Sequence, residues 1–204
     1  MIAIIDYGVG NIRAFINIYK KLDIPIIAAK KEEDLKFADK LILPGVGAFD
    51  HAMEQLKQSG MKESLDELVL KNKIPVIGVC VGMQMLANSS EEGKLPGLGW
   101  IDGSVKKFDG STIQYSTHLP HMGWNDIQPI KENKILTGLE NDAKFYFLHS
   151  YYFHCNQQED AIATTDYGIE FSCAINKENI YGVQFHPEKS HRYGIQLLEN
   201  FSKI

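Results

Sequence analysis

Short apolar runs alternate with amphipathic segments from the start of the chain to Cys80, and no other feature constrains the fold as strongly. Four of the runs have the length and composition of buried strands: residues 2–5, 26–29, 41–43 and 76–79. The segments with helical spacing lie between them: residues 12–22, 49–58 and 61–71. Strands joined in turn by helices predict right-handed crossovers and a mostly parallel sheet, whose functional loops lie at the carboxyl ends of the strands.

Two local signals predict boundaries within this part of the chain. Asn11 precedes the first helical segment, and its side chain is of the type that caps a helix N-terminus. The stretch from Pro44 to Gly47 is predicted to break the third strand, because proline and glycine favour turns over continued pairing.

After about Asn88 the sequence becomes rich in β-forming residues and punctuated by glycine. Antiparallel strands or hairpins are expected in five segments: residues 100–108, 113–115, 144–153, 162–165 and 169–175. The chain then returns to an apolar strand over residues 181–185 and closes with a helix whose sheet-facing side chains are Tyr193, Leu197, Leu198 and Phe201. We therefore expect an α/β fold with a mostly parallel central sheet, flanking helices and additional antiparallel strands, in one domain over residues 1–204.

The charge balance argues against nucleic acid as a partner. The 204 residues carry 21 Lys and Arg against 26 Asp and Glu, a net charge of −5, and lack the basic surplus that binding to phosphate backbones uses.

No apolar run reaches the roughly 18 to 20 residues that span a bilayer, and the start turns acidic at Asp6, too early for a signal peptide. The expected location is the cytoplasm, with no membrane partner.

Of the three cysteines, Cys80 has the sequence context of a nucleophile. None of the three has CxxC or CxxH spacing, so neither a disulfide framework nor a zinc site is predicted. Cys80 ends a buried strand and precedes a helical segment, and the sharp turn of a nucleophile elbow needs small residues such as Gly78 and Gly82 on both sides. The N-terminus of the helix that follows Cys80 points its dipole and free N–H groups toward the sulfur, which favours the thiolate over the thiol. Without that glycine frame, the better interpretation is a small buried side chain, as for Cys155 and Cys173.

A base and a carboxylate for this cysteine are predicted at His186 and Glu188. The strand over residues 181–185 ends at His186, and Pro187 favours an extended backbone there. In extended geometry, residues two apart project to the same side, so Glu188 can approach the imidazole. Alone, His-Pro-Glu indicates an exposed turn. Together with a cysteine elbow it indicates an activated nucleophile.

Two motifs, over residues 78–84 and 182–190, resemble those of the class I glutamine amidotransferases. Four further segments follow the family's order and resemble the branch that serves histidine biosynthesis: residues 6–11, 44–49, 120–125 and 147–152. The resemblance covers nearly the whole chain. It implies hydrolysis of L-glutamine to glutamate and ammonia, and transfer of ammonia to a separate synthase (cyclase) subunit of (βα)₈-barrel fold that forms imidazole glycerol phosphate.

The resemblance also implies roles for single residues. Cys80 is the expected nucleophile, His186 the base and then the acid, and Glu188 the group that orients the imidazole. Acyl transfer through a cysteine thioester needs no metal and no organic cofactor. The expected oxyanion-hole residues are Val46, Gly47 and Val81.

Further positions of the family match substrate and partner contacts. The expected glutamine-binding residues are Gln84, Glu92, His149, Ser150 and Tyr151, and the expected partner-interface residues are Asn11, Trp124 and Tyr146. A solvated acidic turn is the alternative for Glu92 and its neighbour Glu91, and a place in the core is the alternative for Trp124. The histidines without a partner pattern are expected at the surface: His51, His118, His154 and His191.

Three alternative functions are compatible with parts of this pattern. A paralogous glutaminase could supply ammonia to a sugar amidotransferase system of surface-polysaccharide synthesis, with the same chemistry and a different acceptor. A scaffold subunit without catalytic activity is disfavoured because no triad residue is missing. A cysteine peptidase uses the same residue types, but Gln84 and Glu92 match glutamine recognition instead.

Overall fold

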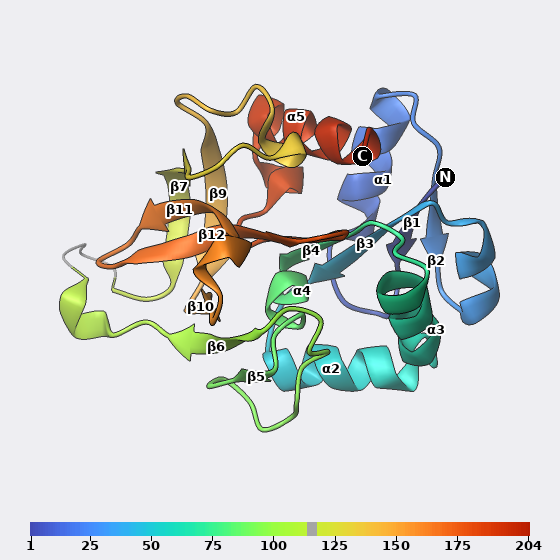
Figure 1. The fold of residues 1–204 in the computed structure, drawn as a ribbon, viewed down its shortest axis with the longest axis horizontal. Helices are drawn as coiled ribbons and strands as arrows, with labels where there is room; N and C mark the ends of the chain where they lie inside the picture. Colours follow the sequence, from blue (N-terminus) through green and yellow to red (C-terminus); the bar gives the residue numbers. More distant parts are fainter. Residues whose placement is uncertain (114–117) are drawn as a thin grey trace.

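The computed structural model of the protein describes residues 1–113 and 118–204 (Figure 1). The strands are β1 (Ile2–Ile5), β2 (Ile26–Ala29), β3 (Lys40–Gly45), β4 (Val76–Cys80), β5 (Ser89–Ser90), β6 (Gly103–Lys107), β7 (His121–Asp126), β8 (Gln128–Pro129), β9 (Lys144–His149), β10 (Tyr151–Cys155), β11 (Ala161–Asp166), β12 (Glu170–Lys177) and β13 (Ile180–Val183). The α-helices are α1 (Ile12–Lys21), α2 (Phe49–Gln58), α3 (Lys62–Asp66), α4 (Val81–Gln84) and α5 (His191–Ser202). The shorter helical turns are η1 (Glu32–Phe37), the π-helical η2 (Glu67–Lys71), η3 (Gly110–Thr112), η4 (Lys134–Leu136), η5 (Gln158–Asp160) and η6 (Pro187–Lys189).

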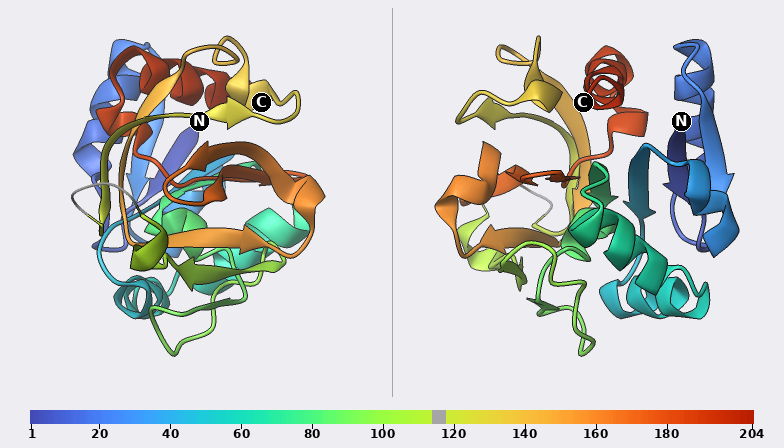
Figure 2. Two further views of the ribbon diagram at one scale, coloured as in Figure 1. Left: turned by 90° about the vertical axis from the view of Figure 1, so that its left-hand side faces the viewer. Right: turned by 45° about the vertical axis from the view of Figure 1, so that its right-hand side comes forward.

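Parallel strands form one half of the main sheet, in the order β2, β1, β3, β4 and β13. Helices α1 and α5 cover one face of this half and α2 to α4 the other, which is why most of its residues are apolar and buried (Figures 1 and 2). Gly78 of β4 lies opposite Gly182 of β13. Because neighbouring parallel strands end at the same edge, the segments carrying Cys80 and His186 leave the sheet side by side.

Antiparallel strands extend the sheet beyond β13, in the order β12, β10 and β6, with β11 paired to β12 and to β8. Strands β7 and β9 form a separate antiparallel ribbon. Its side chains alternate between two faces. The inner face of the ribbon is buried and includes His121, Phe147 and His149, whereas the outer face is exposed and includes Met122, Trp124 and Leu148.

The predicted architecture is confirmed, but two signals in the first half were misread. Strand β3 continues through Pro44 and Gly45, which pair with β4. Because β1 pairs with β3 over residues 40–42, before the proline, the missing N–H of Pro44 costs no ladder hydrogen bond on that side. Asn11 occupies the N-cap position of α1, but its side chain makes no capping hydrogen bond, since its backbone lies at φ −91° and ψ 60°, away from the extended geometry of such caps.

Other boundaries in the second half also differ from the prediction. The segment 144–153 is divided at Ser150 into β9 and β10, and the strand expected over 100–108 is the shorter β6. Most of the strand expected over 113–115 lies outside the described residues. Strand β13 ends at Val183, so His186 reaches its place through an isolated antiparallel bridge to Tyr146. Within residues 1–113 and 118–204, no helix is long and apolar enough to cross a membrane.

Candidate active site

Cys80 lies at a strained turn between β4 and α4. Its backbone has φ 55° and ψ −113°, a region that residues other than glycine rarely adopt and that costs of order 1–3 kcal/mol. The turn is tight on both sides, because a Cβ added at Gly78 would lie 2.6 Å from the Gly82 carbonyl oxygen. A Cβ added at Gly82 would overlap the Leu43 carbonyl oxygen of β3. The glycine frame predicted from sequence is therefore a steric requirement of the turn.

His186 and Glu188 form a buried pair beside this turn. The Nδ1 atom of His186 lies 2.9 Å from Oε1 of Glu188, and the two side chains are 3% and 1% exposed. His186 is extended, at φ −100° and ψ 94°, and its backbone N–H donates to the Tyr146 carbonyl. Glu188 lies in the turn η6, so the approach predicted from extended geometry is instead made by a 3₁₀ turn. Ser190 closes that turn by donating its hydroxyl to the His186 carbonyl at 2.6 Å.

The surroundings of His186 favour its charged form. Burial lowers the pKa of His186, but hydrogen bonds and charge interactions with Cys80 and Glu188 oppose it and together raise this pKa to about 10. The imidazole is therefore protonated at neutral pH while it faces the cysteine. A protonated histidine beside a cysteine stabilises the thiolate, which is the reactive form of the side chain.

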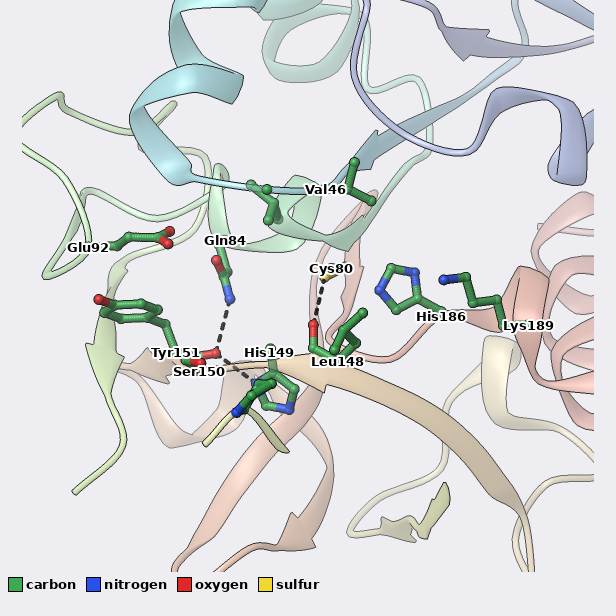
Figure 3. Close-up of a pocket in the computed structure, with 13 residues that line it drawn as sticks. Val46, Cys80, Gln84, Glu92, Leu148, His149, Ser150, Tyr151, His186 and Lys189 are labelled. Atoms are coloured by element: carbon green, nitrogen blue, oxygen red, sulfur yellow. Dashed lines mark hydrogen bonds between the residues drawn. The ribbon is translucent and has the colours of Figure 1, made fainter. Parts of the chain in front are cut away.

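A cavity of about 360 Å³ opens over the cysteine. Figure 3 shows Gln84 and Glu92 on one side of Cys80, with His186 and Lys189 on the other. The other lining residues are Val46, Gly47, Val81, Pro120, Leu148, His149, Ser150 and Tyr151. The expected catalytic, oxyanion and glutamine-binding residues therefore meet at one cavity, apart from Glu188, which is buried behind His186.

The expected oxyanion loop follows β3 and is fixed by contacts between Pro44 and the turn after β1. Tyr7 donates its hydroxyl to the Pro44 carbonyl at 2.6 Å, and a Cβ added at Gly10 would lie 2.7 Å from the Pro44 side chain. Beyond this anchor Val46 is exposed at the cavity, and Gly47 has φ +83°, which suits glycine. Backbone N–H groups of such a loop, and of the residue after a nucleophile, are the donors that stabilise oxyanions.

Glu92 is held by the first turn of helix α2. Its Oε2 atom accepts the Phe49 backbone N–H at 2.9 Å, and Asp50 in turn accepts the backbone N–H groups of Lys94 and Leu95. Burial raises the pKa of Glu92; the Phe49 hydrogen bond lowers it, and the charge of Asp50 raises it further. Glu91 instead points outward to Lys106, so the structure distinguishes the two neighbours.

Gln84 and the segment after β9 share one acceptor, the Tyr151 carbonyl. Gln84 donates to it from Nε2 at 3.0 Å, and Nδ1 of His149 lies 2.8 Å from it (Figure 3). The other ring nitrogen of His149 lies 3.0 Å from Nδ1 of His121. Burial lowers the pKa of His149 to about 3 and that of His121 to about 4, so both rings are neutral at pH 7. The His149 ring is thus engaged by protein atoms at both nitrogens.

The three expected interface residues lie near the outer face of the ribbon or at an exposed turn. Trp124 is 49% exposed, so the alternative of a core position is wrong. It lies opposite Tyr146 in the strand register and stacks on the His191 ring at 5.2 Å. Asn11 is exposed in the turn after β1. The predicted surface positions of His51, His118, His154 and His191 are confirmed.

Sequence reasoning missed several residues that complete the site. Gln184 is fully buried and places Nε2 3.9 Å from the Cys80 sulfur, and the Leu148 carbonyl lies 3.9 Å from the same atom. A polar residue inside the apolar run 181–185 was the available signal for Gln184. Lys189 lines the cavity, with Nζ 5.6 Å from the centre of the Tyr146 ring. His121 was part of a matched segment, but its pairing with His149 depends on the β7–β9 register.

The remaining cysteines have no such surroundings. Cys155 and Cys173 are buried, and burial raises the pKa of both thiols, to about 11 for Cys155. Among the described residues, no group of three or more His, Cys, Asp or Glu side chains is arranged to hold a metal ion.

Comparisons with known proteins match over the full length. The family model described as glutamine amidotransferase class-I matches residues 3–204. A protein of Bdellovibrio bacteriovorus named imidazole glycerol phosphate synthase subunit HisH is 57% identical over 204 residues, covering 100% of both chains. One of the same name from Leptospira interrogans is 52% identical over 204 residues, with the same coverage. A subunit HisH 2 of Pseudomonas aeruginosa is 46% identical, again over the whole of both chains.

Solved structures share the fold at lower identity. A glutamine amidotransferase from Thermotoga maritima has a TM-score of 0.65 at 17% identity, covering 99% of this chain and 82% of that chain. The structure of PurLQS from the same organism has a chain with a TM-score of 0.72 at 13% identity, covering 98% of this chain and 96% of that chain.

Proposed function

Because the chain belongs to the class I glutamine amidotransferases, and within them to the HisH glutaminases, we propose that Cys80, His186 and Glu188 are its catalytic triad. The single observation that carries this assignment is that Cys80 and His186 line the same cavity, which is large enough for an amino acid, while the imidazole is held through Nδ1 by the buried carboxylate of Glu188. The proposal covers the chain as one amidotransferase domain over residues 1–204.

The first half of the reaction forms a thioester. The Cys80 thiolate attacks the side-chain amide carbon of L-glutamine, and the amide oxygen becomes an oxyanion. Backbone N–H groups of Val81 and of the loop at Val46 and Gly47 stabilise this charge, which is worth roughly 10²- to 10³-fold in rate per donor. His186 then gives its proton to the amide nitrogen, the carbon–nitrogen bond breaks, and ammonia leaves.

The second half regenerates the enzyme. His186, now neutral, takes a proton from water while the water oxygen attacks the thioester carbon. The oxyanion forms again and collapses, the carbon–sulfur bond breaks, and glutamate leaves with the sulfur restored as thiolate. Glu188 holds Nδ1 of the imidazole, so that Nε2 faces the reacting atoms in both halves.

Glu92 and Gln84 position the substrate. The carboxylate of Glu92 faces the cavity from the start of α2 and suits the α-ammonium group of glutamine. Gln84 lies one helical turn after the nucleophile with its amide nitrogen engaged by the Tyr151 carbonyl. The backbone of residues 149–151 forms the opposite wall.

The acceptor of ammonia docks on the outer face of the ribbon. Met122, Trp124 and Leu148 are 59%, 49% and 37% exposed there, and Leu148 also lines the cavity. An exposed apolar patch beside an active site marks a protein interface. We assign this face, which includes Tyr146, together with the exposed turn at Asn11, to a cyclase subunit of (βα)₈-barrel fold that forms imidazole glycerol phosphate.

The protein acts in the cytoplasm on this proposal. All three cysteines are free thiols, and reducing compartments keep thiols in that state.

Release of ammonia and glutamate from L-glutamine tests the proposal. We expect activity that increases when the barrel subunit encoded in the same organism is added, and none from Cys80→Ala with or without that subunit. Stimulation by the barrel of a sugar amidotransferase system, and not by the cyclase, would replace the acceptor while keeping the triad. Peptide hydrolysis without glutamine hydrolysis would overturn the proposal.

A further inference from the structure

Gln184 is a fully buried glutamine that the mechanism above does not use. It lies between β13 and His186, and its backbone N–H donates to the Cys173 carbonyl at 2.8 Å. Its side chain contacts the nucleophile, because Nε2 lies 3.9 Å from the Cys80 sulfur. Burying an amide among apolar neighbours costs free energy that only hydrogen bonds offset. Packing alone therefore does not explain a buried amide in contact with the Cys80 sulfur.

The orientation of the Gln184 amide follows from its neighbours. The Tyr151 carbonyl can only accept, so Gln84 must present its NH₂ group to it, at 3.0 Å. The same NH₂ group makes the second contact of Gln84, at 3.1 Å, so Gln184 must present its oxygen there. The NH₂ group of Gln184 is then the end that faces the Cys80 sulfur.

The Tyr151 carbonyl is itself fixed from the inner face of the ribbon. A neutral imidazole donates from one nitrogen and accepts at the other. Because Nδ1 of His149 donates to the Tyr151 carbonyl, Nε2 of that ring is an acceptor, and Nδ1 of His121 donates to it. Asn125 contacts the remaining nitrogen of His121 from its NH₂ group at 3.3 Å. The direction of every hydrogen bond from the ribbon to the sulfur is therefore determined.

We propose that Gln184 is a further catalytic residue whose side-chain amide donates a hydrogen bond to the Cys80 thiolate. The Leu148 carbonyl lies equally close to the sulfur, accepts from the protonated thiol and repels the thiolate. A donor on the sulfur offsets that repulsion and favours ionisation. It also stabilises the sulfur when it leaves from the thioester as a thiolate. This inference rests on the proposed function in one respect, that Cys80 is the nucleophile.

The pH dependence of alkylation by iodoacetamide tests the proposal without glutamine turnover. Alkylation needs the thiolate, and digestion followed by mass spectrometry gives the rate at Cys80 separately from Cys155 and Cys173. We compare the wild-type chain with Gln184→Met, which keeps length and burial and removes the donor. Gln196→Met, on the surface helix α5 and away from the cavity, is the matched control.

In Gln184→Met we expect the midpoint of alkylation to rise by about one pH unit, which is about tenfold slower alkylation at pH values below the wild-type midpoint. Gln84→Met leaves the Gln184 amide in place but removes the partner that orients it. The alkylation midpoint of Gln84→Met should therefore lie between those of the wild type and Gln184→Met. It also serves as the second variant if Gln184→Met does not fold. Gln196→Met should match the wild type.

The outcomes separate this inference from the proposed function. A wild-type midpoint well below that of an ordinary thiol, unchanged in folded Gln184→Met, would overturn the role of Gln184 alone. An unchanged midpoint in Gln84→Met would do the same if that were the folded variant. Wild-type alkylation no faster at Cys80 than at an ordinary thiol would overturn both.

Discussion

The proposed catalytic corner, formed by Cys80, His186 and Glu188, and the outer face of the β7–β9 ribbon border the same cavity but differ in burial. In the corner, each side chain is buried and contacts another group of the same chain. On the outer face, Met122 and Trp124 are about half exposed. This difference agrees with the proposal that the chemistry is built within this chain, whereas the apolar face binds a second protein.

The largest effect is expected from Cys80→Ala. Without the sulfur no thioester forms, and glutamine hydrolysis should fall by more than about 10⁴-fold. The thermal unfolding midpoint and the affinity for the barrel subunit should stay near those of the wild type, because the outer face is unchanged. Enzymatic detection of glutamate, beside a thermal melt and a partner titration, measures all three. Loss of partner binding in the folded variant would erase the distinction between the two regions.

Glu188→Gln should have the next largest effect on activity. The amide keeps the shape of the side chain but no longer stabilises the imidazolium, so we expect kcat to fall roughly 10²- to 10⁴-fold with little change in KM.

The same pair predicts a pH dependence of stability. The pKa of His186 is raised in the folded chain to about 10, so its contribution is fully present below pH 6.5 and is lost as the pH rises through 10. Unfolding free energies of the wild type and Glu188→Gln should therefore differ below pH 6.5 and converge in alkali. A difference that grows with rising pH would contradict the ion pair.

Trp124→Ala should affect partner binding more than activity. Truncating an exposed aromatic anchor should weaken binding of the barrel subunit roughly 10- to 100-fold, as at protein–protein hot spots. The unfolding midpoint and the activity of the isolated chain should change little. Titration by calorimetry measures the affinity. A much lower melting temperature with unchanged affinity would show that Trp124 serves packing instead.

The smallest effect is expected at the inner face of the same ribbon. The lowered pKa values of His121 and His149, about 4 and 3, mean that folding disfavours their protonation. The stability they contribute is present above pH 6.5 and is lost as the pH falls from 6.5 toward 4, while nothing changes at neutral pH. Denaturant unfolding across this range should show the decline, with a shallower slope in His121→Phe. An equal slope of stability against pH in both chains would show that the histidine pair does not cause the decline.

Sequence reasoning predicted the corner better than the ribbon, and the reason is physical. The turn at Cys80 requires glycine at positions within two residues of it, so Gly78 and Gly82 predict the turn from local sequence. His186 and Glu188 are likewise adjacent in sequence, although a 3₁₀ turn and not an extended strand joins them.

Contacts that depend on long-range pairing left no comparable signal. His121 meets His149 only because β7 pairs with β9 in one register, and a shift by one residue would exchange the inner and outer faces. The same register decides that Trp124 is exposed. Gln184 looked like one polar residue in an apolar strand, and its contact with Cys80 required the fold.

Labelling with diazo-oxo-norleucine, a glutamine-like electrophile, tests whether Cys80 is the nucleophile of a glutamine-binding site. The reagent needs both a glutamine-binding cavity and a reactive thiolate, and mass spectrometry of the digested protein identifies the modified residue. We predict one label per chain, on Cys80, suppressed by excess L-glutamine. A label on Cys155 or Cys173, or an unlabelled Cys80 in the folded protein with its barrel subunit present, would contradict it.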